Sequence, residues 1–457
     1  MKKLALLAVL VAAPSLSQDL THPNDMGLPD STWTRPDPSN YQLVLENGLI
    51  AYVAEANQVP LVTMSAFVRA GKVDDESQGA AEALQHALRN SGPSGTSSID
   101  FKASLERMTA ALTVNLHDEW TEVSLNVPTE DLDEALVLFA GLLRNPAISN
   151  MNIEGAARSA GPAAADLSGE SGAALYEGSM GVAVERFHEI LYKDHPYGEK
   201  PTAGDFADLD AGDVTDFHAS YFVPGNMAIA VAGAIDVDDI NNRLVDLFGN
   251  WAASDVPEPR QMPPVKRNEA ALHHFPANKL QSWLVIGHDL PVIPLEEQAA
   301  FDVMNYIMGA YHLNTRMMRE TRYKYGYTND ASAFVEPHWY GPGSYTYRSY
   351  SRPEVIENIY DNMMGELVRI RLEEASDHEL FVAIGALADG TFPVQYLDGY
   401  ALTRSFALEQ LQYGNHDRSA SYAERVRAVT KEDVLNAARK YLLPENMQTV
   451  LVGEESF

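Results

Sequence analysis

An internal repeat constrains the fold of this chain more than any other feature. Residues 209–233 read LDAGDVTDFHASYFVPGNMAIAVAG, and residues 429–453 read VTKEDVLNAARKYLLPENMQTVLVG. Six points match in one register, each 220 residues apart: Asp213/Asp433, Val214/Val434, Tyr221/Tyr441, Pro224/Pro444, Asn226-Met227/Asn446-Met447 and Gly233/Gly453. Each copy predicts a capped amphipathic helix, a turn at Pro-x-Asn and a strand that ends at Gly. A repeat this long indicates a duplicated domain rather than a solenoid unit.

The limits of the two halves follow from composition. Four prolines mixed with charges predict a stiff linker over 256–271: Pro257, Pro259, Pro263 and Pro264. This linker separates a first lobe over 41–255 from a second lobe over 272–457. A polar arm that contains prolines, residues 18–40, precedes the first lobe. We therefore expect two similar lobes in this chain of 457 residues.

The first residues are typical of an export signal. Lys2 and Lys3 precede an apolar run over 4–13, and residues 15–17 offer a small-x-small cleavage site. The run is too short to span a bilayer. The alternative to an export signal is an N-terminal core helix. The chain has no cysteine, which excludes disulfides, thiolate metal sites, a lipoprotein anchor and a cysteine nucleophile. We expect a periplasmic or secreted protein that is cleaved after Ser17 and does not insert into a membrane.

The charge balance bears on the class of partner. The sequence has 33 Lys and Arg against 64 Asp and Glu, which gives a formal net charge of -31. Such a surface repels phosphate backbones and anionic lipid headgroups, which argues against nucleic acid and membrane-surface partners. It suits basic or extended peptides, or it simply keeps the protein soluble.

Periodicity predicts sheets covered by helices. The predicted segments are paired strands over 41–54 and 61–70 with a hairpin turn at 46–48, helices over 79–90 and 99–108, a strand over 112–127, a strand over 280–288 and a helix over 295–311. Strands and helices mix without strict alternation, which favours an α+β fold. We expect two homologous lobes, each a mixed or antiparallel sheet with helices packed on one face.

The predicted helix over 79–90 carries the candidate chemistry. Its apolar residues fall at helical spacing: Ala80, Ala83, Leu84, Ala87 and Leu88. Glu82, Gln85 and His86 stand at i, i+3 and i+4 on the opposite side, where they converge. Zinc peptidases use this spacing to place two metal ligands and a general base on one helical face.

These residues carry a family resemblance. The run 79–88 resembles the inverted zinc motif H-x-x-E-H of the pitrilysin/insulinase family, which includes mitochondrial processing peptidase. Gly95-Thr96, the segment His195-Pro196-Tyr197-Gly198, both Tyr-x-x-Pro-x-Asn-Met turns and the segment 322–329 are similar to family sequences in order and spacing. The resemblance extends over most of the chain and implies a two-lobed peptidase fold.

The departures from the family motif bear directly on activity. Glu82 stands where the family has its first histidine ligand, Gln85 stands where it has the general base, and only His86 matches. Zinc accepts a carboxylate ligand, so Glu82 alone would not abolish metal binding. A neutral amide has no basic oxygen that could take a proton from water, so Gln85 removes general-base catalysis as the family performs it.

The third zinc ligand is also missing from its expected place. The resemblance implies a glutamate near 160–166, a stretch that reads AGPAAAD, and the nearest candidates are Asp166 and Glu170. Weak metal binding by Glu82 and His86, or an ordinary helix-surface pair of these two residues, are the alternatives. The segment His117-Asp118-Glu119 lies on a predicted strand that the resemblance places near the site, but a polar strand edge explains it as well. The histidines without ligand-like spacing are interpreted as surface or packing residues: His273, His274, His312 and His338.

The second half holds candidate substrate-binding residues. In two-subunit members of the family, as the resemblance implies, a partner degenerate at the zinc motif contributes an arginine and a tyrosine that hold the peptide backbone. The arginine maps to Arg322 and the tyrosine position to Asn329, after Tyr327 in the motif. A structural ion pair is the alternative role for Arg322. Nearby tyrosines suit a peptide site, a subunit interface or packing: Tyr323, Tyr325, Tyr327, Tyr340, Tyr345, Tyr347 and Tyr350.

Three functions remain open from sequence. The first is a pseudo-peptidase subunit that binds no cofactor itself, pairs with a catalytic homologue that carries the zinc, and helps to form a chamber around a peptide substrate. The second is a weakly active zinc metallopeptidase that uses Glu82 and His86. The third is a structural or peptide-binding scaffold.

Overall fold

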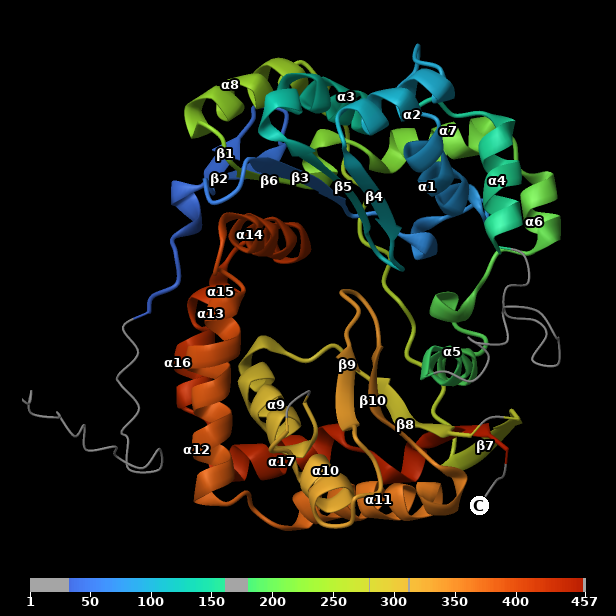
Figure 1. Cartoon of the computed structure of the whole chain (residues 1–457), viewed down its shortest axis with the longest axis vertical. Helices are drawn as coiled ribbons and strands as arrows, with labels where there is room; N and C mark the ends of the chain where they lie inside the picture. Colours follow the sequence, from blue (N-terminus) through green and yellow to red (C-terminus); the bar gives the residue numbers. More distant parts are fainter. Residues whose placement is uncertain (1–32, 161–179, 279, 311–312, 455–457) are drawn as a thin grey trace, which may run out of the picture. The chain divides into compact units, whose positions relative to one another are not determined.

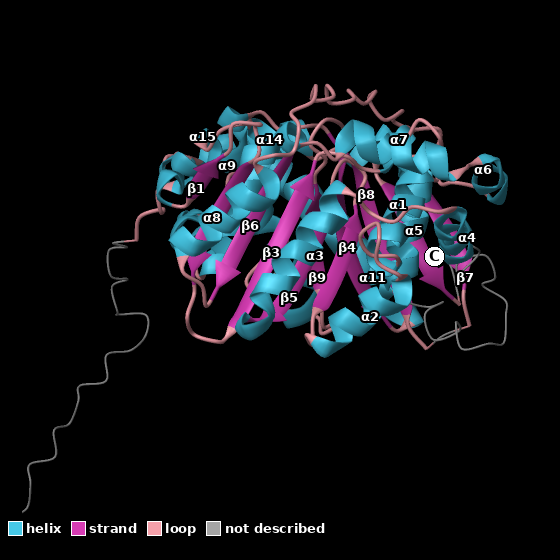
Figure 2. Cartoon of the chain, turned by 90° about the horizontal axis from the view of Figure 1, so that it is seen from above, coloured by secondary structure: helices cyan, strands magenta, loops and turns pink. Residues whose placement is uncertain are grey.

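Two β-sheets organise the part of the chain that the computed structural model describes, which is residues 33–160, 180–278, 280–310 and 313–454. Residues from Arg35 onward form one compact unit. The predicted signal peptide and most of the predicted arm lie outside the described residues. Figure 1 shows the elements in sequence colours, and Figure 2 shows strands of the first sheet side by side beneath helices.

The first sheet has six strands in the order β1-β2-β6-β3-β5-β4. Their bounds are β1 Gln42–Val44, β2 Ile50–Glu55, β3 Leu61–Val68, β4 Ala111–Leu116, β5 Thr121–Pro128 and β6 Met227–Gly233. β2 pairs with β6 in parallel, and the other pairs are antiparallel. The predicted turn at 46–48 joins β1 and β2 in an antiparallel hairpin. The predicted pairing of the segments 41–54 and 61–70 with each other is wrong, because β6 lies between β2 and β3. The apolar strand of the repeat takes the fully buried central position.

The second sheet repeats this arrangement with five strands in the order β7-β11-β8-β10-β9. Their bounds are β7 Ala271–Pro276, β8 Ser282–Leu290, β9 Ala331–Glu336, β10 Gly343–Ser351 and β11 Gln448–Gly453. The outer pair β7 and β11 is parallel, as β2 and β6 are. The α+β prediction of two homologous lobes with mixed sheets is confirmed.

The helices follow the predicted segments closely. Those of the first half are α1 Ala80–Asn90, α2 Ser98–Arg107, α3 Leu132–Arg144, α4 Asn150–Ala160, α5 Met180–Leu191, α6 Ala203–Asp208, α7 Ala211–Tyr221 and α8 Val237–Phe248. Those of the second half are α9 Leu295–Met308, α10 Arg316–Met318, the π-helix η8 Arg319–Tyr323, α11 Ile356–Leu372, α12 Asp377–Gly385, the π-helix η10 Ala386–Thr391, α13 Phe392–Val394, α14 Gly399–Tyr413, α15 Asp417–Ala420, α16 Tyr422–Arg427 and α17 Lys431–Tyr441. The repeat helices α7 and α17 have bounds 220 residues apart, and each begins with a capping box, at Asp210 and at Thr430.

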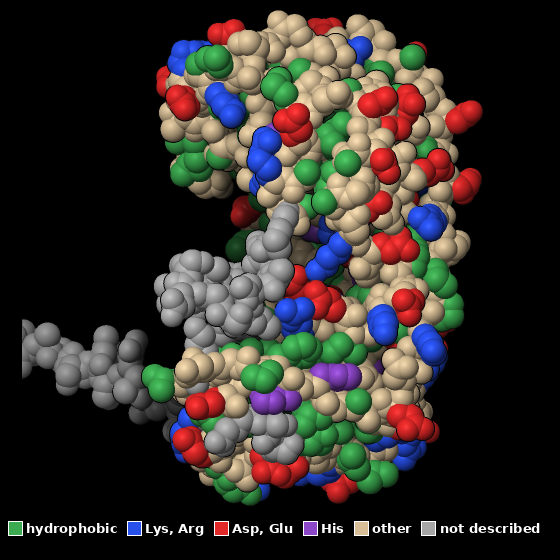
Figure 3. All heavy atoms as spheres, turned by 90° about the vertical axis from the view of Figure 1, so that its right-hand side faces the viewer, with side chains coloured by type: hydrophobic (Ala, Val, Ile, Leu, Met, Phe, Trp, Pro, Cys, Tyr) green, Lys and Arg blue, Asp and Glu red, His purple; other side chains and the backbone are tan. Residues whose placement is uncertain are grey.

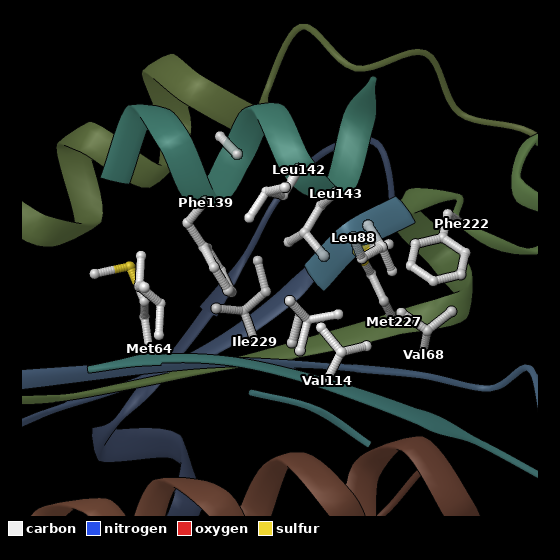
Figure 4. Packing of buried hydrophobic residues seen from close by; sticks show 14 of the residues in the cluster. Met64, Val68, Leu88, Val114, Phe139, Leu142, Leu143, Phe222, Met227 and Ile229 are labelled. Atoms are coloured by element: carbon white, nitrogen blue, oxygen red, sulfur yellow. The ribbon is translucent and has the colours of Figure 1, made fainter. Parts of the chain in front are cut away.

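The core of the first half lies between its sheet and α3. In Figure 4, Phe139, Leu142 and Leu143 of α3 point toward sheet residues that include Met64 and Ile229. All five side chains have no exposed surface. Burial of such side chains stabilises the half by about 1.5–3 kcal/mol each.

The two halves exchange one helix each. α5 follows the first half in sequence but packs on β8 and β11, where Ala183 and Phe187 join Val285 and Val450 in one buried cluster. α14 belongs to the second half but packs on β2 and β6 of the first sheet, opposite α3 and α8 (Figure 1). Each sheet is therefore covered on one face by its own helices and on the other by a helix from the other half.

One predicted strand is two strands. The segment 112–127 forms β4 and β5, joined by a tight turn in which the His117 N–H donates to the Trp120 carbonyl oxygen at 2.9 Å. The polar run His117-Asp118-Glu119 lies in this turn, so its interpretation as a strand edge is wrong. Two of its members are bound by the second half of the chain, which the first half alone could not reveal.

The surface is mixed in charge on the face shown in Figure 3, where acidic and basic side chains are interspersed rather than gathered in one patch. Among the described residues, no single helix has the length and apolar composition of a membrane span. One bent pair, 377–394 with 399–413, meets those criteria only when its two parts are joined.

Candidate functional site

The helix α1 is fixed at its start by an acidic residue of the preceding loop. The Asp75 carboxylate accepts hydrogen bonds from the backbone N–H groups of Gly79 at 2.9 Å and Ala81 at 3.0 Å. Gly79 has φ 103°, in the left-handed region that favours glycine. The predicted apolar face is buried, and Glu82, Gln85 and His86 are half-buried on the other side. The structure therefore places the three candidate residues on one helix, but the side chains of Gln85 and His86 turn to different neighbours, β4 and α4.

Glu82 lies in an environment that favours its neutral form. Burial raises the pKa of the Glu82 carboxyl group above its ordinary value, and the negative charges of Asp75 and Asp118 raise it further, while Lys72 opposes them. Metal binding requires the ionised carboxylate, and burial disfavours that form of Glu82.

Gln85 acts as a hydrogen-bond donor. Its amide Nε2 donates to the backbone carbonyl oxygen of Val114 in β4 at 2.9 Å. A carboxylate at neutral pH has no proton to donate, so a glutamate at this position could not make the same bond. The residue at the general-base position therefore holds α1 to the neighbouring strand.

His86 turns its ring toward α4. A Cβ atom on Gly155 would lie 2.2 Å from His86 Nε2, so this nitrogen is packed against the glycine backbone. The other nitrogen, Nδ1, is 3.5 Å from the Asn152 side-chain amide nitrogen. Burial lowers the pKa of His86, and the positive charges of Arg158, Lys102 and Arg89 lower it further. The same positive charges would repel a metal cation at this ring.

These residues do not fit the zinc site of the H-x-x-E-H family. Of its donors, only one histidine remains, and that ring faces a helix backbone among positive side chains. Within the described ranges, no group of three or more His, Cys, Asp or Glu side chains is placed to hold a metal ion. The predicted third-ligand candidates, Asp166 and Glu170, lie outside the described residues.

The second candidate group lies in η8, which carries Arg322, and in the loop that follows it. Arg322 Nη1 donates to the backbone carbonyl oxygen of Asn329 at 3.0 Å, so the structure brings these two predicted residues together. Tyr327 stacks on Tyr325 with ring centroids 5.1 Å apart and ring planes 8° apart. Asn329 is exposed, and Arg322 and Tyr327 are half-buried, so all three are open to a ligand at one surface.

Buried contacts hold this loop in place. The Tyr327 carbonyl oxygen accepts from the Ser351 hydroxyl, and the Thr328 hydroxyl donates to the Tyr350 carbonyl oxygen at 2.7 Å. The tyrosines predicted as a binding cluster divide between two roles. Tyr345 and Tyr347 are buried in the core of the second half, whereas Tyr323 and Tyr325 are exposed.

A junction between the halves was missed by the sequence analysis. Glu119, in the β4–β5 turn, is 3% exposed and accepts hydrogen bonds from the backbone N–H groups of Trp339 and Tyr340 and from the Tyr197 hydroxyl. Trp339 and Tyr340 lie in the turn between β9 and β10, the hairpin equivalent to β4–β5. The 220-residue repeat was the signal that could have paired these two turns.

His338 has a structural partner that its spacing did not reveal. Its Nε2 lies 3.1 Å from Asp118 Oδ2, and its Nδ1 lies 2.9 Å from the Pro342 carbonyl oxygen. Both partners are acceptors, so the protonated, cationic form of the ring satisfies both of them. Burial alone would raise the pKa of Asp118, but the bond to His338 and the charge of Lys72 hold it at about 2.

The junction predicts a pH dependence of stability. Burial lowers the pKa of His338, but its bonds to Asp118 and Pro342 outweigh burial and raise it above 6.5. A raised histidine pKa gives stability that is complete below the ordinary value and is lost as pH rises through the folded value. As pH rises from about 6 to about 9, we expect the wild type to lose more free energy of unfolding than His338→Gln does. Urea titrations at both pH values measure this, and equal losses in the two proteins would refute it.

The remaining histidines have ordinary contacts. His273 Nε2 lies 3.0 Å from Gln448 Oε1, and His274 Nε2 lies 3.0 Å from the Gly453 carbonyl oxygen, both within the second sheet. These contacts agree with the interpretation of the two residues as packing residues. His312 lies outside the described residues.

Comparison with known proteins agrees with this fold. The model of the insulinase family (peptidase family M16) matches residues 51–171, and the model of the peptidase M16 inactive domain matches residues 208–387. An uncharacterised zinc protease of Mycobacterium leprae is 22% identical over 422 residues, 90% of each chain.

Solved structures share the fold. A peptidase M16 inactive domain from Pseudomonas fluorescens superposes with a TM-score of 0.75 at 19% identity, over 91% of this chain and 98% of that chain. The periplasmic protease PqqL of Escherichia coli superposes with a TM-score of 0.68 at 16% identity, over 99% of this chain and 49% of that one. The two matched models follow one another along the chain, with the degenerate motif inside the first and Arg322 inside the second. This protein belongs to the insulinase (M16) peptidase family.

Proposed function

We propose that this chain is a non-catalytic subunit of an exported two-chain zinc peptidase. A catalytic homologue supplies the zinc, and this chain helps to enclose the peptide and hold it for cleavage. The chain binds no cofactor of its own in this proposal, and its N-terminal segment directs it to the periplasm or the exterior.

The observation that carries the proposal is the hydrogen bond of Gln85. The family mechanism needs a carboxylate at this position to take a proton from water. Here the side chain is an amide that donates to the Val114 carbonyl oxygen. His86, the one matching ligand, faces Gly155 among positive charges. These contacts also speak against the alternative of a weakly active zinc peptidase that uses Glu82 and His86.

One structural relative supports a second subunit. This chain superposes over 99% of its own length on 49% of the periplasmic protease PqqL, so it corresponds to about half of that protease. In that protease, a further part of similar size accompanies the part that matches this chain. We infer that the second chain is the catalytic homologue.

The end of η8 and the loop that follows it form the proposed peptide contact. The Arg322 guanidinium has several N–H donors, of which Nη1 binds the Asn329 carbonyl oxygen. The remaining donors suit the carbonyl oxygens of a peptide. Asn329 and the stacked pair of Tyr325 and Tyr327 offer further polar and aromatic contacts beside it.

A scaffold without peptide contacts is the second candidate. It is favoured by the bond between Arg322 and Asn329 itself, because a guanidinium that holds its own loop has a sufficient structural role. The loss of catalysis is common to both functions, so only a measurement on the substrate side separates them.

Co-expression tests the assembly. The partner is a homologue of similar length with an intact His-x-x-Glu-His motif, encoded by the same genome. We expect the two chains to co-purify and to cleave unstructured peptides, whereas this chain alone cleaves none and contains far less than one zinc per chain by elemental analysis. Zinc-dependent cleavage by this chain alone, abolished by His86→Ala, would revive the second alternative.

Arg322→Ala in the complex tests the peptide contact. Loss of one charged hydrogen-bond donor costs about 1.5–3 kcal/mol, so we expect kcat/KM of the complex to fall about tenfold to a hundredfold. Lys324→Ala is the matched control, because Lys324 is a nearby cation whose partner Glu320 lies four residues before it in η8. Equal activity of the wild-type and Arg322→Ala complexes would favour the scaffold.

A further inference from the structure

The outward side of β4 is where the first sheet could accept another strand. Within the described residues, β4 is an end strand that is hydrogen-bonded only to β5. The turn bond from His117 to Trp120 makes Asn115 and Thr113 the residues that exchange hydrogen bonds with β5. Val114, between them, turns its N–H and carbonyl groups away from β5. End strands with free outward groups accept extended peptides or other strands.

Gln85 occupies this outward position. Its amide donates to the Val114 carbonyl oxygen at 2.9 Å, at the middle of the strand. The Val114 side chain is fully buried, so the strand cannot rotate to offer another acceptor without exposing it. An incoming strand would have to displace the Gln85 amide before it could pair with β4 at this residue.

The duplicated half provides an internal comparison. Across the first sheet, Ala66, Val123 and Val114 lie side by side on β3, β5 and β4. Across the second sheet, Ile286, Tyr347 and Ala333 lie side by side on β8, β10 and β9. Ala66 and Ile286 are 220 residues apart, so Val114 and Ala333 are equivalent positions on the two end strands.

The equivalent position in the second half is also closed. The Ala333 N–H donates to the Gly309 carbonyl oxygen, directly after α9, at 2.5 Å. α9 follows β8 as α1 follows β3, so the two helices correspond. Both halves therefore tie the middle of the end strand to the equivalent helix, one through a side chain and the other through backbone.

We propose that Gln85 closes the β4 edge to strand addition. The amide supplies the donor that an added strand would otherwise supply, and the first half thereby matches the closed edge of the second. A carboxylate at position 85 would repel the Val114 carbonyl oxygen and leave the edge open. This inference concerns the first half alone and does not depend on a partner subunit.

Peptide binding to the full chain tests the closure. The probe is a short fluorescein-labelled peptide that alternates valine and lysine, which favours a strand and complements the net charge of -31. By fluorescence anisotropy, we expect Gln85→Ala and Gln85→Glu to bind the probe about tenfold more tightly than the wild type, since the competing hydrogen bond is gone.

A second change assigns the gained binding to β4. Leu112 is another residue whose N–H faces outward, so Leu112→Pro removes a donor from the edge without breaking the pairing with β5. We expect Gln85→Ala with Leu112→Pro to return to the wild-type affinity. The proposal is overturned if the Gln85 variants bind no more tightly than the wild type, or if Leu112→Pro leaves their affinity unchanged.

A test on the wild type does not depend on whether a variant folds. A probe with a photoreactive benzoylphenylalanine at its centre is irradiated with the unmodified chain, and the cross-linked residues are identified by mass spectrometry. Closure predicts no cross-link to residues 111–116. Saturable cross-linking to this strand in the wild type would show that the edge is open.

Discussion

Replacement of Glu119 by alanine is expected to lower the free energy of unfolding by about 3 kcal/mol. The Glu119 carboxylate is 3% exposed and accepts from two backbone N–H groups of the second half and from the Tyr197 hydroxyl. Alanine leaves these three donors without an acceptor in a buried place, and each unmade bond costs about 1–3 kcal/mol if water does not replace it. Urea unfolding followed by tryptophan fluorescence measures the loss and also reports on Trp120 and Trp339, which stack at 5.6 Å.

Two further variants serve as comparisons for Glu119→Ala. Glu119→Gln keeps one acceptor oxygen for Tyr340 and Tyr197 but presents an NH₂ group to Trp339, so we expect a loss of about 1–2 kcal/mol. Glu134→Ala removes an exposed partner of Arg107 and is expected to change stability by less than about 0.5 kcal/mol. A Glu119→Ala protein as stable as Glu134→Ala would mean that the junction does not hold the halves together.

Glu379→Ala is expected to cost about 3–5 kcal/mol, because it leaves a buried guanidinium without its counterion. Arg316 is 4% exposed, and its Nε and Nη2 donate to the Glu379 carboxylate at 2.8 and 2.9 Å. Burial alone would raise the pKa of Glu379, but the bond from Arg316 and the helix cap at Ser376 outweigh it and hold the pKa far below its ordinary value. Thermal unfolding followed by circular dichroism measures the loss.

Glu379→Ala is also expected to disturb the candidate peptide contact. Arg319 also donates to Glu379, at 2.7 Å, and begins the π-helix that carries Arg322. Asp389→Ala, which removes the exposed partner of Arg427, is the matched control and should leave the melting temperature nearly unchanged. If Glu379→Ala and Asp389→Ala have the same melting temperature, the Arg316 ion pair contributes nothing to stability.

Much of the fold could be predicted from the repeat. The equivalent strands β6 and β11 and helices α7 and α17 are local patterns, with caps, apolar periodicity and a Pro-x-Asn turn that depend on neighbours in sequence. The candidate face of α1 was predictable for the same reason, since helical spacing alone puts Glu82, Gln85 and His86 on one side of the helix.

The remainder depends on contacts between distant residues. The local sequence does not predict that α14 covers the first sheet or that β6 separates β2 from β3. The role of Gln85 could be predicted only in part. Its chemistry excludes a general base, but its hydrogen bond to Val114 could not be predicted without the position of β4. The Asp118 and His338 pair joins residues whose separation equals the repeat length, a relation that is informative only once the two hairpins are known to meet.

The exchange of α5 and α14 has a consequence for the order of assembly. The first sheet is synthesised before α14, so its α14-facing side stays uncovered until residues 399–413 have emerged from the ribosome. α5, in turn, is made before the strands β8 and β11 on which it packs. Neither half can finish folding before nearly the whole polypeptide exists, so both halves depend on contacts between residues far apart in sequence.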